Sequence, residues 1–234
     1  MNTEDQIKER YQGDQGREYH GKKREIPESA FPWVTRLRFE KIAPYVKSTH
    51  VVMEYGVGFG WNIAKLKCQK RLGYDLAHHL EPMLKKRGIE FVSDTSVLSD
   101  HSVDIMVCHH VLEHVPAPID VLAEIHRLLK HNGKLLLFVP YEKEKRYRKY
   151  DPKEPNHHLY AWNVQTLGNL VNDCGFEITS SGVRRFGYDR FAANWAQRLG
   201  LGEPGFRLIR GAVHTLKPAQ EVSIVATPQS FDRP

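Results

Sequence analysis

The chain has 234 residues, of which 41% are hydrophobic and 26% charged, and its formal net charge is +6. This composition is typical of a globular domain with a substantial core and excludes a disordered chain. No apolar run approaches the ~18 residues of a membrane-spanning helix, and the mild positive charge is compatible with an anionic partner without establishing one.

The first 30 residues are expected to form an arm or a lid, because they are rich in charge and contain three glycines. Tyr11, Tyr19 and the nearby Trp33 would let this segment fold over a bound ligand as a lid, and the alternative is a disordered tail. They lack the apolar core of a secretory signal, so the cytoplasm is the expected location. Residues 31–46 carry apolar side chains at helical spacing and predict a helix. Residues 31–234 are expected to form a single domain.

From residue 51 onward, strand and helix signals alternate along the chain. Strands are predicted at 51–56, 71–76, 89–93, 102–110 and 134–140, and helices at 62–69, 78–88 and 117–133. The last two helices are expected to end at Gly88 and Gly133. This alternation predicts an α/β fold with a parallel sheet and helices on both faces.

The pattern changes after Pro140. A long charged loop occupies 141–160, and a helix ended by glycine (163–176) and a strand (177–186) follow it. Residues 187–218 form a mixed stretch with one predicted helix, at 190–200. A final strand is predicted at 221–227.

The segment VVMEYGVGFG (51–60) places Glu54 and three alternating glycines, Gly56, Gly58 and Gly60, where a strand gives way to a predicted helix. Such a junction is typical of nucleotide binding. A dinucleotide site would have the spacing G-x-G-x-x-G, and an acid beside the glycines would repel a pyrophosphate. The pattern better suits a ligand that carries a positive sulfonium and an ammonium group. Asp75, at the end of the second strand, can accept hydrogen bonds from both ribose hydroxyls.

Five segments in order resemble the class I S-adenosylmethionine (SAM) dependent methyltransferases. They are EYGVGFG, GYDL, FVSDTSVL, the block SVDIMVCHHVLEHVPAPIDVLAEIHRLLKHNGKLLLFVP, and HHLYAWNVQTLGNLVNDCGFEI. The resemblance covers about residues 50–180. It implies a Rossmann-like, doubly wound and mostly parallel sheet of seven strands with the last strand reversed. It also implies that the acceptor side carries insertions at about 141–160 and 187–218.

The resemblance further implies SAM as cofactor, S-adenosylhomocysteine as product, and a site across the carboxyl ends of the first two strands. Asp75 would bind the ribose, and Asp94 would meet the adenine amino group beside the Thr95 backbone. The residues expected to contact the cofactor are Glu54, Tyr55, Gly56, Gly58, Gly60, Asp75, Leu76, Asp94, Thr95 and His109.

Histidines gather after the fourth strand and after the charged loop. The members of this group are His109, His110, His114, His157 and His158. A hydroxyl or amine nucleophile can need a base with a pKa near neutrality, which histidine supplies. We expect His110 and His158, on opposite loops, to be the catalytic candidates. The alternative is a structural or cofactor-pocket role for the VLEHV segment.

His110, Glu113 and His114 also fit the spacing H-x-x-E-H of some metal sites. Some methyltransferases of this fold hold magnesium with an acid-x-x-Glu-His cluster. A histidine at the first position suits zinc or iron better, and ligands divided between a strand end and a turn would be poorly preformed. Our interpretation of the sequence therefore assigns no metal.

A basic run lies in the charged loop and consists of Lys143, Lys145, Arg146, Arg148 and Lys149. With the tyrosines between them, these residues could bind RNA or an acidic substrate, but neighbouring acids offset much of the charge. We therefore expect a small-molecule acceptor (a sugar, a lipid precursor or another metabolite) methylated at oxygen or nitrogen. The alternatives are an RNA or protein methyltransferase, and a SAM-binding regulatory or scaffolding subunit without turnover. Nucleic acid is not the favoured partner, no membrane span is expected, and the oligomeric state is left open.

Overall fold

The computed structural model describes residues 9–21, 26–142, 149–152 and 156–229. Within this part of the chain, one sheet has the strand order β3-β2-β1-β4-β5-β7-β6. Its strands are β1 (Val51–Tyr55), β2 (Lys70–Tyr74), β3 (Glu90–Val92), β4 (Val103–His109), β5 (Leu129–Pro140), β6 (Phe176–Arg185) and β7 (Gln220–Pro228). Strand β7 runs antiparallel to both β5 and β6, and the other pairs are parallel. The predicted seven-stranded sheet with a reversed last strand is confirmed.

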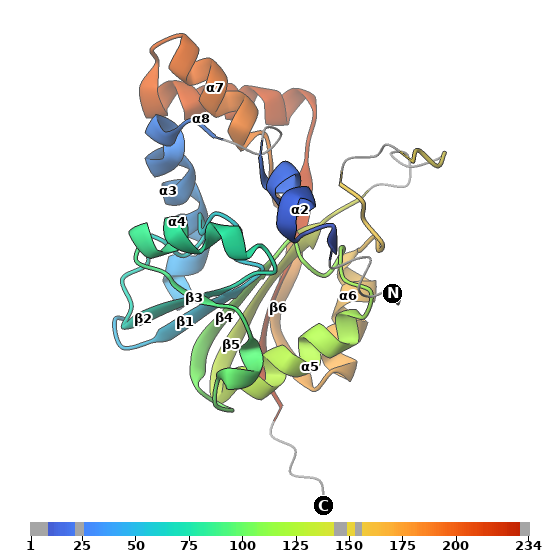
Figure 1. Cartoon of the computed structure of the whole chain (residues 1–234). Helices are drawn as coiled ribbons and strands as arrows, with labels where there is room; N and C mark the ends of the chain where they lie inside the picture. Colours follow the sequence, from blue (N-terminus) through green and yellow to red (C-terminus); the bar gives the residue numbers. More distant parts are fainter. Residues whose placement is uncertain (1–8, 22–25, 143–148, 153–155, 230–234) are drawn as a thin grey trace, which may run out of the picture.

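Helices cover both faces of the sheet (Figure 1). Helices α5 (Pro118–Leu128) and α6 (Val164–Asp173) pack on one face, and α3 (Phe31–Ile42) and α4 (Glu81–Lys86) on the other. Side chains of a strand alternate between the two faces, so Met53 points toward α5 whereas Val52 points toward α3. The same alternation brings Glu54 and His109, at the carboxyl ends of β1 and β4, to the α3 side.

A helical pair, α7 (Asp189–Arg198) and α8 (Gly202–Leu216), lies beyond the sheet and packs on the start of α3 (Figure 1). Phe206 of α8 shares a small core with Ala30, Val34 and three alanines of α7. The sequence predicted α7 but missed α8. Three glycines and a proline give the α8 segment a weak helix propensity, and burial of Phe206 supplies the stability that the propensity lacks.

The remaining helical segments are short. They are α2 (Gly13–His20) and the 3₁₀ turns η1 (Glu28–Ala30), η2 (Ala43–Tyr45), η3 (His78–Leu80) and η4 (Thr95–Val97). None of the described helices is both long enough and apolar enough to cross a lipid bilayer. Parts of the predicted arm (1–8 and 22–25) and most of the basic run (143–148) lie outside the described residues.

The predicted helix at 62–69 is wrong. The chain makes turns over 61–65, in which the Ala64 amide donates to the Gly60 carbonyl, and it continues irregularly to β2. The Gln69 amide, which a helix through residue 69 would direct to the Lys65 carbonyl, donates instead to the His50 carbonyl at 2.9 Å. A bond to the segment before β1 therefore replaces the last helical bond.

The predicted helix at 117–133 ends earlier than expected. Helix α5 stops at Leu128, and residues 129–133, with Gly133, belong to β5. The amides of His101 and Ser102 donate to the carbonyls of Arg127 and Leu128. These bonds cap the helix from another part of the chain, so Gly133 is not a helix cap.

Candidate functional site

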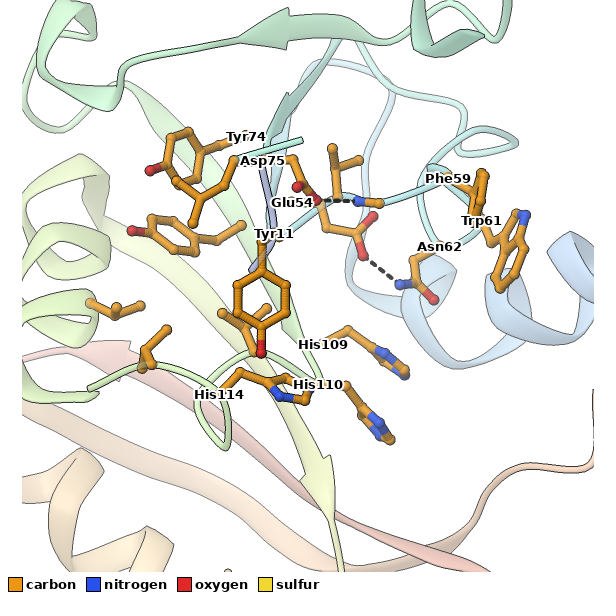
Figure 2. A pocket seen from close by; sticks show the side chains of 18 of the residues that line it. Tyr11, Glu54, Phe59, Trp61, Asn62, Tyr74, Asp75, His109, His110 and His114 are labelled. Atoms are coloured by element: carbon orange, nitrogen blue, oxygen red, sulfur yellow. Dashed lines mark hydrogen bonds between the residues drawn. The ribbon is translucent and has the colours of Figure 1, made fainter. Parts of the chain in front are cut away.

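A cavity of about 480 Å³ opens at the carboxyl ends of β1, β2 and β4, a size within the ~300–1,000 Å³ usual for small-molecule sites. Its wall is formed by the residues after β1, by Asp75 and Leu76 after β2, by residues 109–117 after β4, and by Arg38 of α3. Tyr11, which precedes α2, completes it. Figure 2 shows the Tyr11 ring reaching across the pocket with its hydroxyl toward His114.

The three glycines after β1 serve different purposes. All three have positive φ angles, and a Cβ on Gly56 or Gly60 would lie 2.3 Å from Val111 or 2.5 Å from Ile89. Those two positions must therefore be glycine because the backbone is left-handed and packs closely against the protein itself. A Cβ on Gly58 would meet nothing within 4 Å. Since Gly58 lines the cavity, its bare backbone lets a ligand approach.

Glu54 is almost fully buried at the cavity wall. Its Oε1 accepts a hydrogen bond from the Asn62 side chain (Figure 2), and its Oε2 is buried with no hydrogen-bond partner among the described residues. Burial raises the pKa of Glu54 to about 8, against the opposing hydrogen bond from Asn62. A cationic ligand would satisfy the open oxygen and restore the carboxylate charge.

Asp75 holds the glycine turn. Its two carboxylate oxygens accept the Gly58 amide at 2.7 Å and the Ala77 amide at 2.9 Å. Each oxygen keeps a further lone pair, so the carboxylate can still accept hydrogen bonds from a ligand in the cavity. Beside it, the rings of Tyr55 and Tyr74 pack with centroids 4.7 Å apart and add an aromatic wall.

Four polar groups meet at the far end of the cavity: His109, His110, Lys41 and Glu221. Lys41 Nζ lies 2.8 Å from both His109 Nε2 and Glu221 Oε1, and Glu221 Oε2 is 3.4 Å from Nε2 of each histidine. Glu221 reaches this edge because β7 is antiparallel, so the first residues of β7 lie beside the last residues of β5.

Burial and charge set the ionisation of this group. Burial lowers the pKa of His110 to about 4 and that of His109 well below its usual value. Burial also lowers the pKa of Lys41 to about 8, although Glu221 opposes the shift. Burial raises the pKa of Glu221, but the nearby nitrogens of both histidines and the charge of Lys41 prevail and hold it well below its usual range. At neutral pH, two neutral imidazoles therefore surround a Lys41–Glu221 ion pair.

A second buried network ties the cavity to the helical pair. Arg38 donates to Asp189 at 3.0 Å, and Arg210 of α8 donates to the other oxygen of Asp189 at 2.8 Å. Arg38 also reaches Asn62, the partner of Glu54, at 3.5 Å. Helices α3, α7 and α8 are thus joined by charged groups that end at the cavity.

The structure brings most of the predicted site residues to the cavity and leaves four, Gly60, Asp94, Thr95 and His158, outside its wall. Lining it are Glu54, Tyr55, Gly56, Gly58, Asp75, Leu76, His109 and His110. Gly60 packs against Ile89 and Leu84. Asp94 is exposed and accepts the Ser96 amide at 2.9 Å, and the Thr95 carbonyl accepts a hydrogen bond from Arg127. Neither lines the cavity.

His158 is also absent from the wall, so the expected pair of His110 and His158 does not face one ligand. The His158 ring lies 4.9 Å from that of His114, and its Nδ1 is 2.8 Å from Glu142 Oε1. His110 turns the other way, toward His109 and Phe186.

Several residues of the site were missed by the sequence reasoning: Arg38, Lys41, Asn62, Phe186, Asp189 and Glu221. One signal was available for Arg38 and Lys41, because both interrupt the apolar face of the predicted helix at 31–46. A second was Glu221, an acid at the first position of a strand expected to be buried and reversed. Asp189 carried no such signal, whereas Tyr11 belongs to the arm that the sequence offered as a lid.

The H-x-x-E-H residues do not gather around one point. His109, His110 and Glu221 form one cluster of metal-ligand type, and Glu113, His114 and His158 form another. His110 Nδ1 is 3.8 Å from Glu113 Oε1, but its Nε2 faces Glu221 in the first cluster.

Comparisons with known proteins agree with this architecture. A family model described as a methyltransferase domain matches residues 24–181. Among solved structures, the chain is similar to a Bacillus halodurans protein assigned as a methyltransferase, at 18% identity and a TM-score of 0.60, over 83% of this chain and 98% of that one.

Two further solved structures are similar. One is Haemonchus contortus phosphoethanolamine N-methyltransferase 2, in complex with phosphomonomethylethanolamine and S-adenosylhomocysteine, at 14% identity and a TM-score of 0.58 over 85% of this chain and 53% of that one. The other is a SAM-dependent methyltransferase from Thermotoga maritima, at 18% identity and a TM-score of 0.57 over 85% and 90%. No curated protein matches the chain. At these identities, the likeness to solved structures is one of fold.

Proposed function

The chain belongs to the methyltransferase domain family, and we propose that it transfers a methyl group from SAM to an oxygen or nitrogen atom of a small-molecule acceptor. The observation that carries this proposal is the two-sided wall of the cavity. Glu54 and Asp75 lie on one side, and Arg38, His110 and Phe186 on the other.

The first side fits SAM. The buried Oε2 of Glu54 has no hydrogen-bond partner among the described residues, and it can accept a hydrogen bond from the ammonium group of SAM. Asp75 keeps the lone pairs to accept a ribose diol, and Gly58 presents backbone without a side chain. We propose Glu54, Gly58 and Asp75 as the main cofactor contacts, with Tyr55, Leu76 and His109 beside them.

When bound, SAM supplies a methyl group that its sulfonium already activates, so the protein mainly needs to align the acceptor. Within the chain, His110 is the group at the cavity wall that is placed to take a proton from the acceptor. It is neutral at pH 7 because burial lowers its pKa to about 4. Glu221, 3.4 Å from its Nε2, would stabilise the imidazolium that forms. Lys41 keeps Glu221 ionised between turnovers.

A small acceptor is favoured by the enclosure of the cavity. Its acceptor side is bounded by Arg38, Trp61, His110, Phe186 and Tyr11, which come from distant parts of the chain. We propose that the arm of residues 1–30 closes over bound ligands and so excludes water, a role that the place of Tyr11 in the cavity wall supports. We also propose that the segments 141–160 and 187–218 serve the acceptor side, and for the latter the support is Asp189, which holds Arg38.

The test is incubation of the purified protein with SAM labelled at the methyl group and a cell extract separated into metabolite, RNA and protein fractions. Label that enters the metabolite fraction, and is lost in the Asp75→Ala variant, supports the proposal. Label in RNA or protein would make the chain a macromolecular methyltransferase. Binding of SAM without transfer to any fraction would indicate a regulatory subunit.

A further inference from the structure

We propose that Glu113, His114 and His158 form a binding site for one divalent transition-metal ion at the edge of the cavity. Their ligand atoms lie within 4.8 Å of one another, and His114 Nε2 is 3.7 Å from Glu113 Oε1. Neighbouring ligand atoms around tetrahedral Zn²⁺ are about 3.4 Å apart, from bond lengths near 2.1 Å. Small side-chain adjustments would close this group around an ion.

Two segments far apart in sequence are held together to make the group. The amides of Leu159 and Tyr160 both donate to the backbone carbonyl of Glu113, at 2.7 and 3.3 Å. These bonds fix the residue after His158 against the turn that carries Glu113 and His114. His157 has a φ of +52°, a left-handed conformation that non-glycine residues adopt only sparingly and that often marks functional sites.

Glu142 gives the group the outer partner that metal-binding histidines need. Its Oε1 lies 2.8 Å from His158 Nδ1, and its side chain is almost buried. A histidine that donates one ring N–H to a carboxylate is fixed in one tautomer and is more basic at its other nitrogen. His158 Nε2 is therefore left as the ligand atom.

The other cluster of metal-ligand type, formed by His109, His110 and Glu221, has no room for a metal ion. Lys41 Nζ already lies 2.8 Å from both His109 Nε2 and Glu221 Oε1. An ammonium group thus occupies the position that a metal ion would need. The metal site is consequently placed at His158 and not at His110, the first residue of the sequence motif.

The donor set indicates the kind of ion. Two imidazole nitrogens and one carboxylate oxygen suit Zn²⁺, Fe²⁺ or Mn²⁺ better than Mg²⁺, which prefers oxygen ligands. Because His114 lines the cavity, a remaining coordination position would be open to a ligand there. The site does not depend on the proposed transfer reaction, because metal binding can be measured without SAM and without an acceptor.

The experiment is titration of chelator-treated protein with Zn²⁺ and, separately, Mn²⁺ by calorimetry, with metal content measured by elemental analysis. We expect about one equivalent for the parent protein. His158→Ala should weaken binding at least tenfold, and Glu142→Gln by roughly ten- to a hundredfold, as other outer-sphere changes do. His158 lies on a loop, so its variant should keep the parent circular dichroism spectrum, and that spectrum is recorded for each protein.

His131→Ala is the matched control. The rings of His101 and His131 lie 4.2 Å apart and could bind an adventitious ion. Unchanged binding in this variant, with weakened binding in the other two, supports the site. Binding that survives His158→Ala but is lost in His131→Ala would overturn it, as would a folded parent protein that takes up neither ion.

Discussion

Burial in the fold changes the ionisation of Glu54. Its pKa is raised to about 8 by burial, so it is mostly protonated in the ligand-free protein at pH 7. A cationic ligand at its open oxygen would favour the charged form. The carboxyl group should therefore lose its proton when SAM binds.

We predict that SAM binding at pH 7 releases about 0.9 proton, the fraction protonated for a group with a pKa near 8. Affinity should rise as the pH increases to about 8 and then level off. Calorimetry in buffers of different ionisation enthalpy measures the release. The Glu54→Gln variant should bind more weakly and release no proton at this site. Equal proton release in both proteins would assign the proton to another group.

The same residue should affect stability. A carboxyl group whose folded-state pKa is raised above its unfolded value costs stability that grows with pH from about 4.5 and levels off above about 8. Glu54→Gln should therefore raise the melting temperature of the ligand-free protein at pH 8, and by less as the pH falls toward 4.5. At pH 4 the two proteins should melt alike. A variant that melts at or below the parent at pH 8 would contradict the prediction.

Asp75 should contribute to ligand affinity more than to chemistry. Charge-assisted hydrogen bonds are worth ~1.5–3 kcal/mol, so Asp75→Ala should weaken SAM binding roughly ten- to a hundredfold. Asp75→Asn is the matched control, because it keeps an acceptor oxygen for the turn and should lose less. Unchanged affinity in Asp75→Ala would remove this residue from the site.

The role of His110 as proton acceptor can be tested through the pH dependence of kcat. The sequence led us to expect a rate that rises with pH through a pKa between about 6 and 7. Burial lowers the pKa of His110 to about 4, so kcat should not depend on this group above about pH 5. His110→Ala should lower kcat ~10²–10⁴-fold with little change in SAM affinity, and His131→Ala should not. A fall of less than tenfold would leave alignment of the acceptor as the mechanism.

At the scale of elements, the ion pairs that connect the helical pair to α3 differ in burial. Asp189 lies between Arg38 and Arg210, with all three side chains largely buried. Glu40 and Arg207 join α3 to α8 at the surface, where both are about half exposed. Because they differ in burial, the Arg38–Asp189 and Glu40–Arg207 pairs should contribute differently to the free energy of unfolding.

We predict that Asp189→Ala lowers the free energy of unfolding by about 3 kcal/mol, because it leaves two buried guanidinium groups without their carboxylate. Glu40→Ala, which breaks the exposed pair, should change it by less than about 1 kcal/mol. Denaturant unfolding of both variants makes the comparison. Similar values for the two would mean that Asp189 does not join these helices as the geometry indicates.

At the scale of the whole molecule, residues from both ends of the chain contribute to the cavity and its surroundings. Tyr11, near the start, lines the cavity, and Glu221, near the end, lies 3.4 Å from His110 of the wall. The Tyr11 ring packs edge-on against His114, with centroids 5.8 Å apart. Removing Tyr11 should therefore open the cavity while leaving the sheet intact.

Deletion of residues 1–25 should leave the melting temperature largely unchanged and reduce turnover, because water would enter the site. The sheet and its two packed faces are complete without this segment. Tyr11→Ala should reproduce part of the loss. Full activity in both proteins would show that the arm is a tail and not a lid.

The sequence alone determined the sheet and the part of the site that contains Glu54, Gly58 and Asp75. Alternating strand and helix signals predicted a parallel sheet because each depends on local periodicity, and the resemblance to class I methyltransferases implied seven strands with the last reversed. Glu54, Gly58 and Asp75 were found because they lie at or just after the carboxyl ends of strands, which must share one edge. The errors have non-local causes: the Gln69 amide bonds to the His50 carbonyl, amides before β4 cap α5, and packing of Phe206 stabilises α8.

Only the tertiary structure decided the part of the site that contains Lys41, Glu221 and Arg38. Lys41 and Glu221 are far apart in sequence, and an ion pair at 2.8 Å between them exists because the reversed β7 returns to the edge beneath α3. Arg38 and Asp189, and likewise Glu113 and His158, are also far apart in sequence and are brought together only by the fold. Their pairing depends on how elements pack in space, and no local pattern records it. Burial in that packed interior is also what moves the pKa values of Glu54 and His110, which the sequence had left at their ordinary values.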